Sequence, residues 1–194
     1  HNFGGGTVQP EAALDALRTL ARDARFALHL DGARLWNAHV ATGTPLAELA
    51  RGFDTVSVCL SKGLAAPVGS VLVASAERIA EARVWRKRYG AGMRQAGILA
   101  AAGRYALAHH LQRLADDHDR ARRLADGLGI DPSTVDTNIV MLEVADAPAL
   151  AAAAQEQGVL VSVLGPRRAR FVTHLDVDDD GIDQAIKVLQ PLTA

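Results

Sequence analysis

The stretch Ser57-Val-Cys-Leu-Ser-Lys-Gly-Leu64 decides the fold class, because it has the pattern of a buried strand followed by a packed loop. Residues 55–60 are rich in valine and leucine, which is typical of a strand inside a sheet, and Lys62 opens the loop that follows. Residues 26–30 form a second short apolar run that ends at Asp31. Because ligands of α/β proteins bind beyond the ends of such strands, we expect Lys62 and Asp31 to lie at a binding edge.

Lys62 is a candidate for covalent chemistry. The chain has 21 basic residues, but only three of them are lysines, namely Lys62, Lys87 and Lys187. A lysine amine can form an imine with a carbonyl group, which a guanidinium cannot do. A strand-end carboxylate such as Asp31 could hold a pyridine nitrogen protonated, so the pair meets the requirements of a pyridoxal phosphate site. Two alternatives stay open: Lys62 as an ordinary surface lysine, and Asp31 as the cap of a helix that starts near Leu35.

Composition places the chain among globular proteins. It has 194 residues, of which 49% are hydrophobic and 22% are charged, enough for one or two packed domains. The formal net charge of -1, with acids and bases interleaved, predicts no nucleic-acid partner and no membrane surface as partner. No apolar run approaches the roughly 20 residues that a bilayer span requires. The single cysteine, Cys59, excludes an internal disulfide, so we expect a soluble protein of the reducing cytoplasm.

Helix and strand patterns alternate along the chain. Helices are predicted at residues 11–25, 76–89, 93–128, 147–157 and 179–189, and further strands at residues 70–74, 139–144, 159–163 and 170–173. The predicted helix at 93–128 is long enough to bridge two domains. We therefore expect the C-terminal part of a larger α/β domain at residues 1–114 and a smaller α/β domain at residues 115–194.

Three other patterns have structural interpretations that we prefer to ligand binding. The glycine triplet 4–6 lacks the spacing of a dinucleotide fingerprint and predicts a tight turn. Residues 176–181 resemble the first half of an EF-hand loop, but Lys187 stands where a bidentate glutamate belongs, so they indicate the start of a helix. No metal site is predicted. Three histidines of one predicted helix lack metal-site spacing and are expected to be solvated or to join the domains: His109, His110 and His118.

Arg170 lies inside the apolar run Ala169-Arg-Phe-Val-Thr-His174. An arginine within a strand that alternates into a core usually faces an anion, and its planar guanidinium suits a carboxylate held through two hydrogen bonds. The alternative is an arginine on a strand at the edge of the sheet. We prefer carboxylate binding, because a protein of two domains provides a cleft.

Several motifs resemble, in order and spacing, the family of aromatic amino acid β-eliminating lyases and threonine aldolases, and within it the low-specificity L-threonine aldolases. Besides the lysine stretch, they are His29-Leu-Asp-Gly-Ala-Arg-Leu-Trp-Asn37, Ala66-Pro-Val-Gly-Ser70 and Gly92-Met-Arg-Gln-Ala-Gly97. The resemblance covers nearly the whole chain, and the lysine motif is its most specific part.

This resemblance implies a pyridoxal-phosphate-dependent transferase-like fold of the aspartate aminotransferase type, with pyridoxal 5'-phosphate as cofactor. It implies that Lys62 forms the imine, that Asp31 contacts the pyridine nitrogen and that Arg34 lies near the phenolic oxygen. Arg170 would bind the α-carboxylate of the substrate. A homotetramer with sites at subunit boundaries is also implied. Two further basic residues, near the cofactor phosphate or a subunit boundary, are second-tier sites: Lys87 and Arg94.

The activity that the resemblance implies is cleavage of the Cα–Cβ bond of L-threonine or L-allo-threonine, which gives glycine and an aldehyde. Similar enzymes carry a long segment before the equivalent of His1, including a phosphate-binding loop, so we expect this chain to lack the N-terminal portion of the enzyme. Two alternatives remain open. One is another β-eliminating lyase that uses the same cofactor, and the other is a truncated, non-catalytic remnant that serves as an assembly partner.

Overall fold

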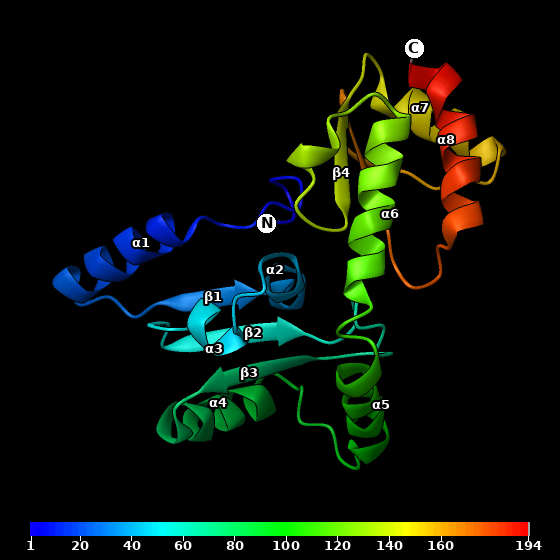
Figure 1. The fold of residues 1–194 in the computed structure, drawn as a ribbon. Helices are drawn as coiled ribbons and strands as arrows, with labels where there is room; N and C mark the ends of the chain where they lie inside the picture. The colour runs from blue at the N-terminus through cyan, green and yellow to red at the C-terminus, as the bar shows by residue number, and fades with distance from the viewer. Residues whose placement is uncertain (194) are drawn as a thin grey trace. The chain divides into compact units, whose positions relative to one another are not determined.

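The computed structural model describes residues 1–193, and the chain divides into two compact units (Figure 1). The N-terminal unit comprises Gln9–Gln112. The C-terminal unit runs from Arg113 to the end of the described chain and also includes His1–Val8. No sequence pattern indicates that the first residues of the chain pack with the last ones.

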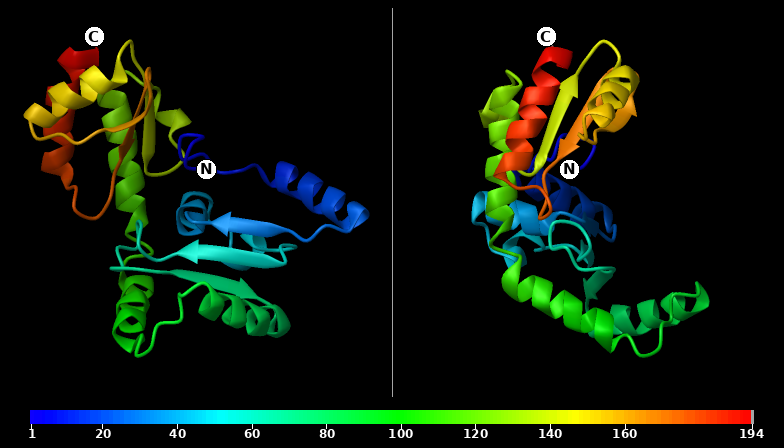
Figure 2. Two further views of the ribbon diagram at one scale, coloured as in Figure 1. Left: turned by 180° about the vertical axis from the view of Figure 1, so that it is seen from behind. Right: turned by 90° about the vertical axis from the view of Figure 1, so that its right-hand side faces the viewer.

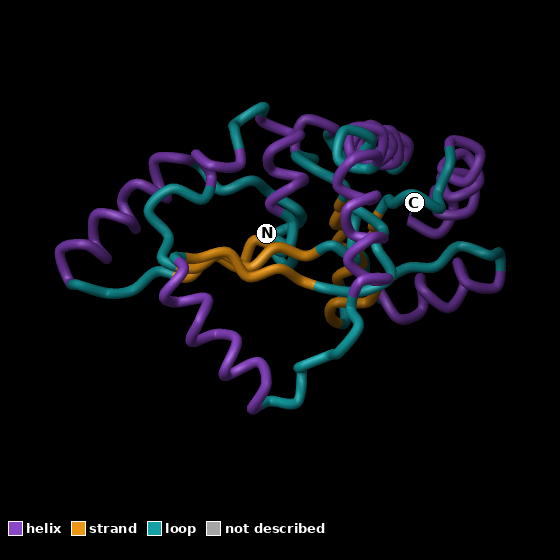
Figure 3. Tube along the Cα trace, turned by 90° about the horizontal axis from the view of Figure 1, so that it is seen from below, coloured by secondary structure: helices purple, strands orange, loops and turns teal. Residues whose placement is uncertain are grey.

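The N-terminal unit is built on a sheet with the strand order β1-β2-β3 and has helices on both sides of the strands (Figure 3). Strands β1 (His29–Gly32) and β2 (Thr55–Cys59) are parallel, whereas β3 (Ser70–Ala74) is antiparallel to β2. Because β1 and β2 are parallel, their carboxyl ends lie at the same edge of the sheet. The helices are α1 (Glu11–Ala24), α2 (Leu35–Thr42), α3 (Leu46–Leu49), α4 (Ala76–Arg88) and α5 (Gly97–His109).

Burial differs sharply between neighbouring strands of this sheet. Strand β2 buries Val56, Val58 and Cys59. Strand β3 lies at the edge of the described sheet and exposes apolar side chains on both faces, with 53% of Val73 exposed on one face and 40% of Leu72 on the other. A strand that is apolar on both faces is typical of the interior of a parallel or mixed sheet. Strand β3 therefore has the residue composition of a buried strand, although it lies at the edge of the described sheet.

The C-terminal unit has a second sheet, with the strand order β4-β6-β5 and antiparallel pairing throughout (Figure 2). The strands are β4 (Ile139–Glu143), β5 (Ser162–Gly165) and β6 (Arg168–Val172). The helices are α6 (Leu114–Gly127), the short 3-10 helix η1 (Pro132–Thr134), α7 (Ala147–Glu156) and α8 (Asp179–Thr193).

Alternation along β6 separates the two faces of this second sheet. Ala169 and Phe171 are buried in the core together with residues of all three α-helices. Arg170, between them, therefore points to the opposite face of the sheet. The core is made largely of small and branched side chains: Ala121, Leu124, Ala125, Val140, Ala147, Leu150, Ala154, Ile182, Val188 and Leu189.

The single long helix expected at residues 93–128 is wrong. The chain forms two helices, α5 and α6, which are separated by a turn at residues 110–113. The turn contains neither glycine nor proline, so residue preference alone would carry the helix through it. Here His110 contacts a carbonyl oxygen of another loop, at Leu64, and such tertiary contacts override local preference.

Other local predictions can be checked directly. The glycine triplet does form a turn, and residues 176–181 do lead into α8, where the Asp178 carboxylate accepts a hydrogen bond from the Gly181 backbone N–H at 2.8 Å. The strand expected at residues 159–163 begins later, at Ser162. His118 is buried rather than solvated, with 2% of its surface exposed. None of the described helices is long and apolar enough to cross a membrane.

Candidate active-site residues in the two units

Lys62 lies on a loop whose backbone is held by hydrogen bonds. The Leu60 N–H donates to the Gly69 carbonyl oxygen at 2.9 Å, and the Ala66 N–H donates to the Leu60 carbonyl oxygen at 3.0 Å. Leu64 is almost fully buried, at 1% exposure, while Lys62 itself is exposed. The lysine amine is therefore accessible to a ligand, although the backbone that carries it is fixed.

Asp31 lies at the same sheet edge as the lysine loop. In the register of the parallel strands it is opposite Ser57, two residues before the end of β2. Its Oδ1 accepts a hydrogen bond from the Ala33 backbone N–H at 3.1 Å. The N-cap of α2 is Arg34, which is half-buried, and no side chain caps this helix. The alternative that Asp31 is the cap of this helix is therefore wrong.

The thiol of Cys59 lies near the amine of Lys62. Its Sγ lies 3.3 Å from the Ser61 Oγ, and the cysteine is buried at the end of β2. Burial raises the pKa of this thiol, but hydrogen bonds from Ser61 and Lys62 and the positive charge of Lys62 outweigh burial and lower the pKa below its usual value. The Lys62 amine thus lies beside the carboxyl end of β2.

The second-tier residues, Lys87 and Arg94, belong to the same unit. Lys87 is an exposed residue of the last turn of α4, and its side chain lies over Gly92, where an added Cβ would be 2.5 Å from the Lys87 Cδ. Arg94 is exposed in the segment between α4 and α5. Their proposed contacts with the cofactor stay predictions.

Arg170 lies in the C-terminal unit, on β6, which is the central strand of its sheet. The alternative of an arginine on an edge strand is therefore wrong. Its Nη1 donates to the Asn2 Oδ1 at 2.8 Å, and its Nη2 donates to the Ser162 Oγ at 3.4 Å. Its Nε is buried and has no hydrogen-bond acceptor among the described residues. A buried donor without an acceptor costs free energy and is uncommon in folded proteins.

The N-terminal segment His1–Val8 is what brings Asn2 to Arg170. Gly6 has a φ of +75°, and a Cβ there would lie 2.6 Å from the Thr137 Oγ1, so the turn needs glycine to approach the sheet this closely. The Thr137 hydroxyl donates to the Gly6 carbonyl oxygen at 2.6 Å. Sequence reasoning missed Asn2, because its contact with Arg170 joins residues 168 positions apart. It also missed Ser162, which is opposite Arg170 only through the pairing of β5 with β6.

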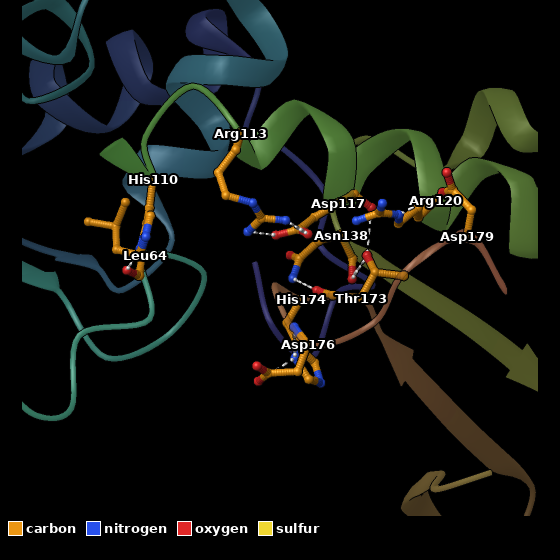
Figure 4. A network of polar contacts seen from close by, with 10 residues as sticks. All are labelled: Leu64, His110, Arg113, Asp117, Arg120, Asn138, Thr173, His174, Asp176 and Asp179. Atoms are coloured by element: carbon orange, nitrogen blue, oxygen red, sulfur yellow. Dashed lines mark hydrogen bonds and ion pairs between the residues drawn. The ribbon is translucent and has the colours of Figure 1, made fainter. Parts of the chain in front are cut away.

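A buried polar network fixes the end of β6 to α6 (Figure 4). The Arg113 guanidinium binds the fully buried carboxylate of Asp117 at 2.5 Å. The backbone carbonyl oxygen of Asp117 accepts a hydrogen bond from the Thr173 hydroxyl at 2.6 Å. The Asn138 amide donates to the Thr173 carbonyl oxygen at 2.8 Å. The strand that carries Arg170 is thereby held in register with the rest of the unit.

Comparison with known proteins identifies the family of the chain. The family model described as beta-eliminating lyase matches residues 1–147. The chain belongs to the beta-eliminating lyase family. This confirms the resemblance inferred from the lysine and aspartate motifs.

Within this family, the chain is similar to curated low-specificity L-threonine aldolases. It is 44% identical over 179 residues to the enzyme of Escherichia coli O157:H7, covering 91% of this chain and 54% of that protein. It is 38% identical over 199 residues to the probable low-specificity L-threonine aldolase 2 of Arabidopsis thaliana, covering 97% of this chain and 56% of that protein. The chain thus spans about half the length of the curated relatives it matches.

Solved structures confirm the predicted fold class of this chain. A putative L-allo-threonine aldolase from Listeria monocytogenes has a TM-score of 0.78 at 18% identity, covering 96% of this chain and 58% of that one. Aminotransferases share the fold as well. The fold is therefore α/β, of the pyridoxal-phosphate-dependent transferase-like type.

Burial of His118 predicts that the folded chain loses stability in acid. Burial, with the nearby Arg122 charge, lowers its pKa from 6.5 to about 4. At pH values between these two pKa values, His118 is therefore protonated in the unfolded chain but neutral in the folded chain. We expect the unfolding free energy to fall by about 3 kcal/mol as the pH drops through this window. Urea unfolding at several pH values measures this loss.

The matched control for this prediction is His109, an exposed histidine at the last residue of α5. The His109→Gln variant should keep the acid-dependent loss, whereas His118→Gln should lose most of it, because glutamine does not titrate. An unchanged pH dependence in His118→Gln would contradict this assignment.

Proposed function

We propose that this chain supplies the lysine-bearing and arginine-bearing parts of a pyridoxal-phosphate-dependent aldehyde-lyase. The enzyme would cleave L-threonine and L-allo-threonine to glycine and an aldehyde. The observation that carries the proposal is the position of Lys62 and Asp31 at one edge of the β1–β2 pair. The similarity to curated low-specificity L-threonine aldolases supports the reaction and the substrate class. Below, the full-length enzyme means a polypeptide of the relatives' length that contains this chain.

The chemistry of the side chains fits pyridoxal phosphate. When bound, this cofactor supplies an electron sink for the charge left on the substrate Cα after bond cleavage. The Lys62 amine is accessible and would attach to the cofactor aldehyde. The Asp31 carboxylate would keep the pyridine nitrogen protonated, since a nearby negative charge favours the protonated form. Arg34, which directly precedes α2, would lie near the phenolic oxygen.

Arg170 would bind the substrate α-carboxylate. Its guanidinium is oriented by Asn2 and Ser162, so the direction of its donors is set before a substrate arrives. Such preorganisation lowers the entropy that binding would otherwise cost. Fixing the carboxylate fixes the orientation of the Cα substituents, and with it the bond that breaks.

The remaining parts of the proposal concern assembly and location. We assign residues 1–114 to the cofactor-binding domain and residues 115–194 to the small domain, although His1–Val8 form part of the C-terminal compact unit. Lys87 and Arg94 would contact the cofactor phosphate or a neighbouring subunit. The exposed apolar residues of β3 support burial of this strand in the full-length enzyme. For that enzyme we propose a homotetramer, as the resemblance implies. The single cysteine supports a reducing, cytoplasmic compartment.

Product analysis tests this function. The full-length enzyme is incubated with L-threonine and with L-allo-threonine, and the products are separated and identified. Stoichiometric glycine and acetaldehyde from both substrates are expected. Ammonia and a 2-oxo acid would instead show β-elimination and would contradict the proposed Cα–Cβ cleavage.

Replacing Arg170 by lysine tests the carboxylate anchor. Lysine keeps the charge but loses the planar, two-point contact, and a charge-assisted hydrogen bond of this kind contributes about 1.5 to 3 kcal/mol. We expect kcat/KM for threonine to fall about 10- to 100-fold in the full-length enzyme. The matched control is Arg168→Lys on the same strand, because Arg168 is exposed and pairs with Glu143 at 2.5 Å. Equal losses in both variants would contradict a specific role for Arg170.

A further inference from the structure

Helix α5 contacts the lysine loop on both sides of Lys62. Before the lysine, the Leu60 side chain packs on Gly103, where an added Cβ would lie 3.0 Å from the Leu60 Cδ1. After the lysine, the Leu64 carbonyl oxygen lies 2.7 Å from the Nδ1 of His110, the residue that caps α5 (Figure 4). These two contacts bracket the lysine within a span of five residues of the loop.

The contact between His110 and Leu64 defines a single tautomer of the imidazole. A carbonyl oxygen can only accept a hydrogen bond, so the His110 Nδ1 must carry the proton. The Leu64 side chain is buried, with 1% exposed, and His110 is half-buried. A hydrogen bond shielded in this way is lost at greater cost than one exposed to water.

The strand that leads into the loop is held separately. The indole N–H of Trp36, on α2, donates to the Cys59 carbonyl oxygen at 2.9 Å. Cys59 is the last residue of β2, so this contact fixes the strand end from which the loop departs. The segment from Cys59 to Leu64 is thus anchored at its start by α2 and at its end by α5.

We propose that His110 is a positioning residue that holds the lysine loop in place and thereby aims the Lys62 amine. The proposal rests on the proposed function, in which this amine binds the cofactor. His110 acts through the backbone of Leu64 and does not touch the reacting atoms. The neighbouring histidine is expected to have no such role, because the exposed His109 ring packs at a tilt against Tyr105, with 4.3 Å between the ring centroids.

Four variants of the full-length enzyme test this role. His110→Ala removes the donor. His110→Asn restores it, because the asparagine amide nitrogen occupies nearly the place of the imidazole Nδ1. His110→Gln places its nitrogen near the position of Nε2 and should not restore the contact. His109→Ala is the matched control for loss of an imidazole at this helix end.

The first readout is hydrogen exchange of the loop amides in the absence of cofactor. The Leu60 and Ala66 amides, which are hydrogen-bonded within the loop, should exchange roughly tenfold faster in His110→Ala and His110→Gln, as expected when a partly buried hydrogen bond is lost. Rates in His110→Asn and His109→Ala should stay within about twofold of the parent. Unchanged exchange in His110→Gln, or equal acceleration in His110→Asn, would overturn the proposal.

The second readout is the site of cofactor attachment. After addition of pyridoxal phosphate and reduction with borohydride, the share of label on Lys62, relative to Lys87 and Lys187, should fall in His110→Gln and be retained in His110→Asn. Faster loop exchange without any change in labelling would overturn the positioning role. If the parent enzyme itself carried the label on Lys87 or Lys187, the proposed function would fail, while the exchange result would still report on the anchor.

Discussion

Replacing Lys62 by arginine is expected to lower kcat for threonine cleavage by about 10²- to 10⁴-fold in the full-length enzyme, the range attributed to a positioned catalytic group. Arginine preserves the positive charge beside Cys59 but cannot form an imine. Loss of the Schiff-base absorbance should accompany the loss of rate. Absorbance spectra and steady-state kinetics of the purified variant measure both effects.

Lys187 provides the control for this replacement. It is an exposed residue of α8 with no proposed role in the site, so Lys187→Arg should change kcat by no more than about twofold. A Lys62→Arg variant that retained the absorbance band and full turnover would remove Lys62 from the mechanism.

The second large effect is expected at Asp31. Asparagine has nearly the same shape as aspartate but no charge, so Asp31→Asn would no longer favour the protonated pyridine nitrogen. We expect kcat to fall about 10²- to 10³-fold, the size of effect seen when one preorganised electrostatic partner is removed. Cofactor retention should weaken by no more than about tenfold, because the Lys62 attachment is unaffected and one hydrogen bond is worth about 1 kcal/mol.

The contrast between turnover and retention separates a catalytic role from a structural one. Asp54, before β2 at the other end of the strand, offers a matched control, because its carboxylate accepts the Leu28 N–H at 2.8 Å and pairs with Arg78 at 2.7 Å. Asp54→Asn should lower the unfolding free energy and leave kcat nearly unchanged. Equal losses of turnover and retention in Asp31→Asn would argue that Asp31 only supports the loop.

The fold was largely predictable where a local pattern determines the structure. The valine-rich run of β2 and the turn residues after it predicted strand, loop and strand in the right places. The helix break at residues 110–113 was not predictable, because it depends on a contact between His110 and a loop 46 positions away. The burial of His118 likewise depends on packing within the C-terminal unit, which no periodicity in the sequence reveals.

The candidate site likewise contains residues that the sequence predicts and residues that only the folded structure reveals. Lys62, Asp31 and Arg170 are singled out by residue type and by their place in predicted strands. The supporting residues Asn2, Ser162 and His110 are polar side chains in ordinary surroundings, and only the folded chain brings them to their partners. Residues whose role depends on a partner elsewhere in the fold therefore cannot be predicted from the sequence. Reactive or charged residues at the end of a predicted strand can be.

The central claim is that Lys62 carries the cofactor, and peptide mapping after borohydride reduction tests it most directly. The full-length enzyme is saturated with pyridoxal phosphate, reduced, digested and analysed by mass spectrometry. The account predicts a phosphopyridoxyl group on the peptide that contains Ser61-Lys62-Gly63. A label on Lys87 or Lys187 instead, with Lys62 unmodified, would contradict it.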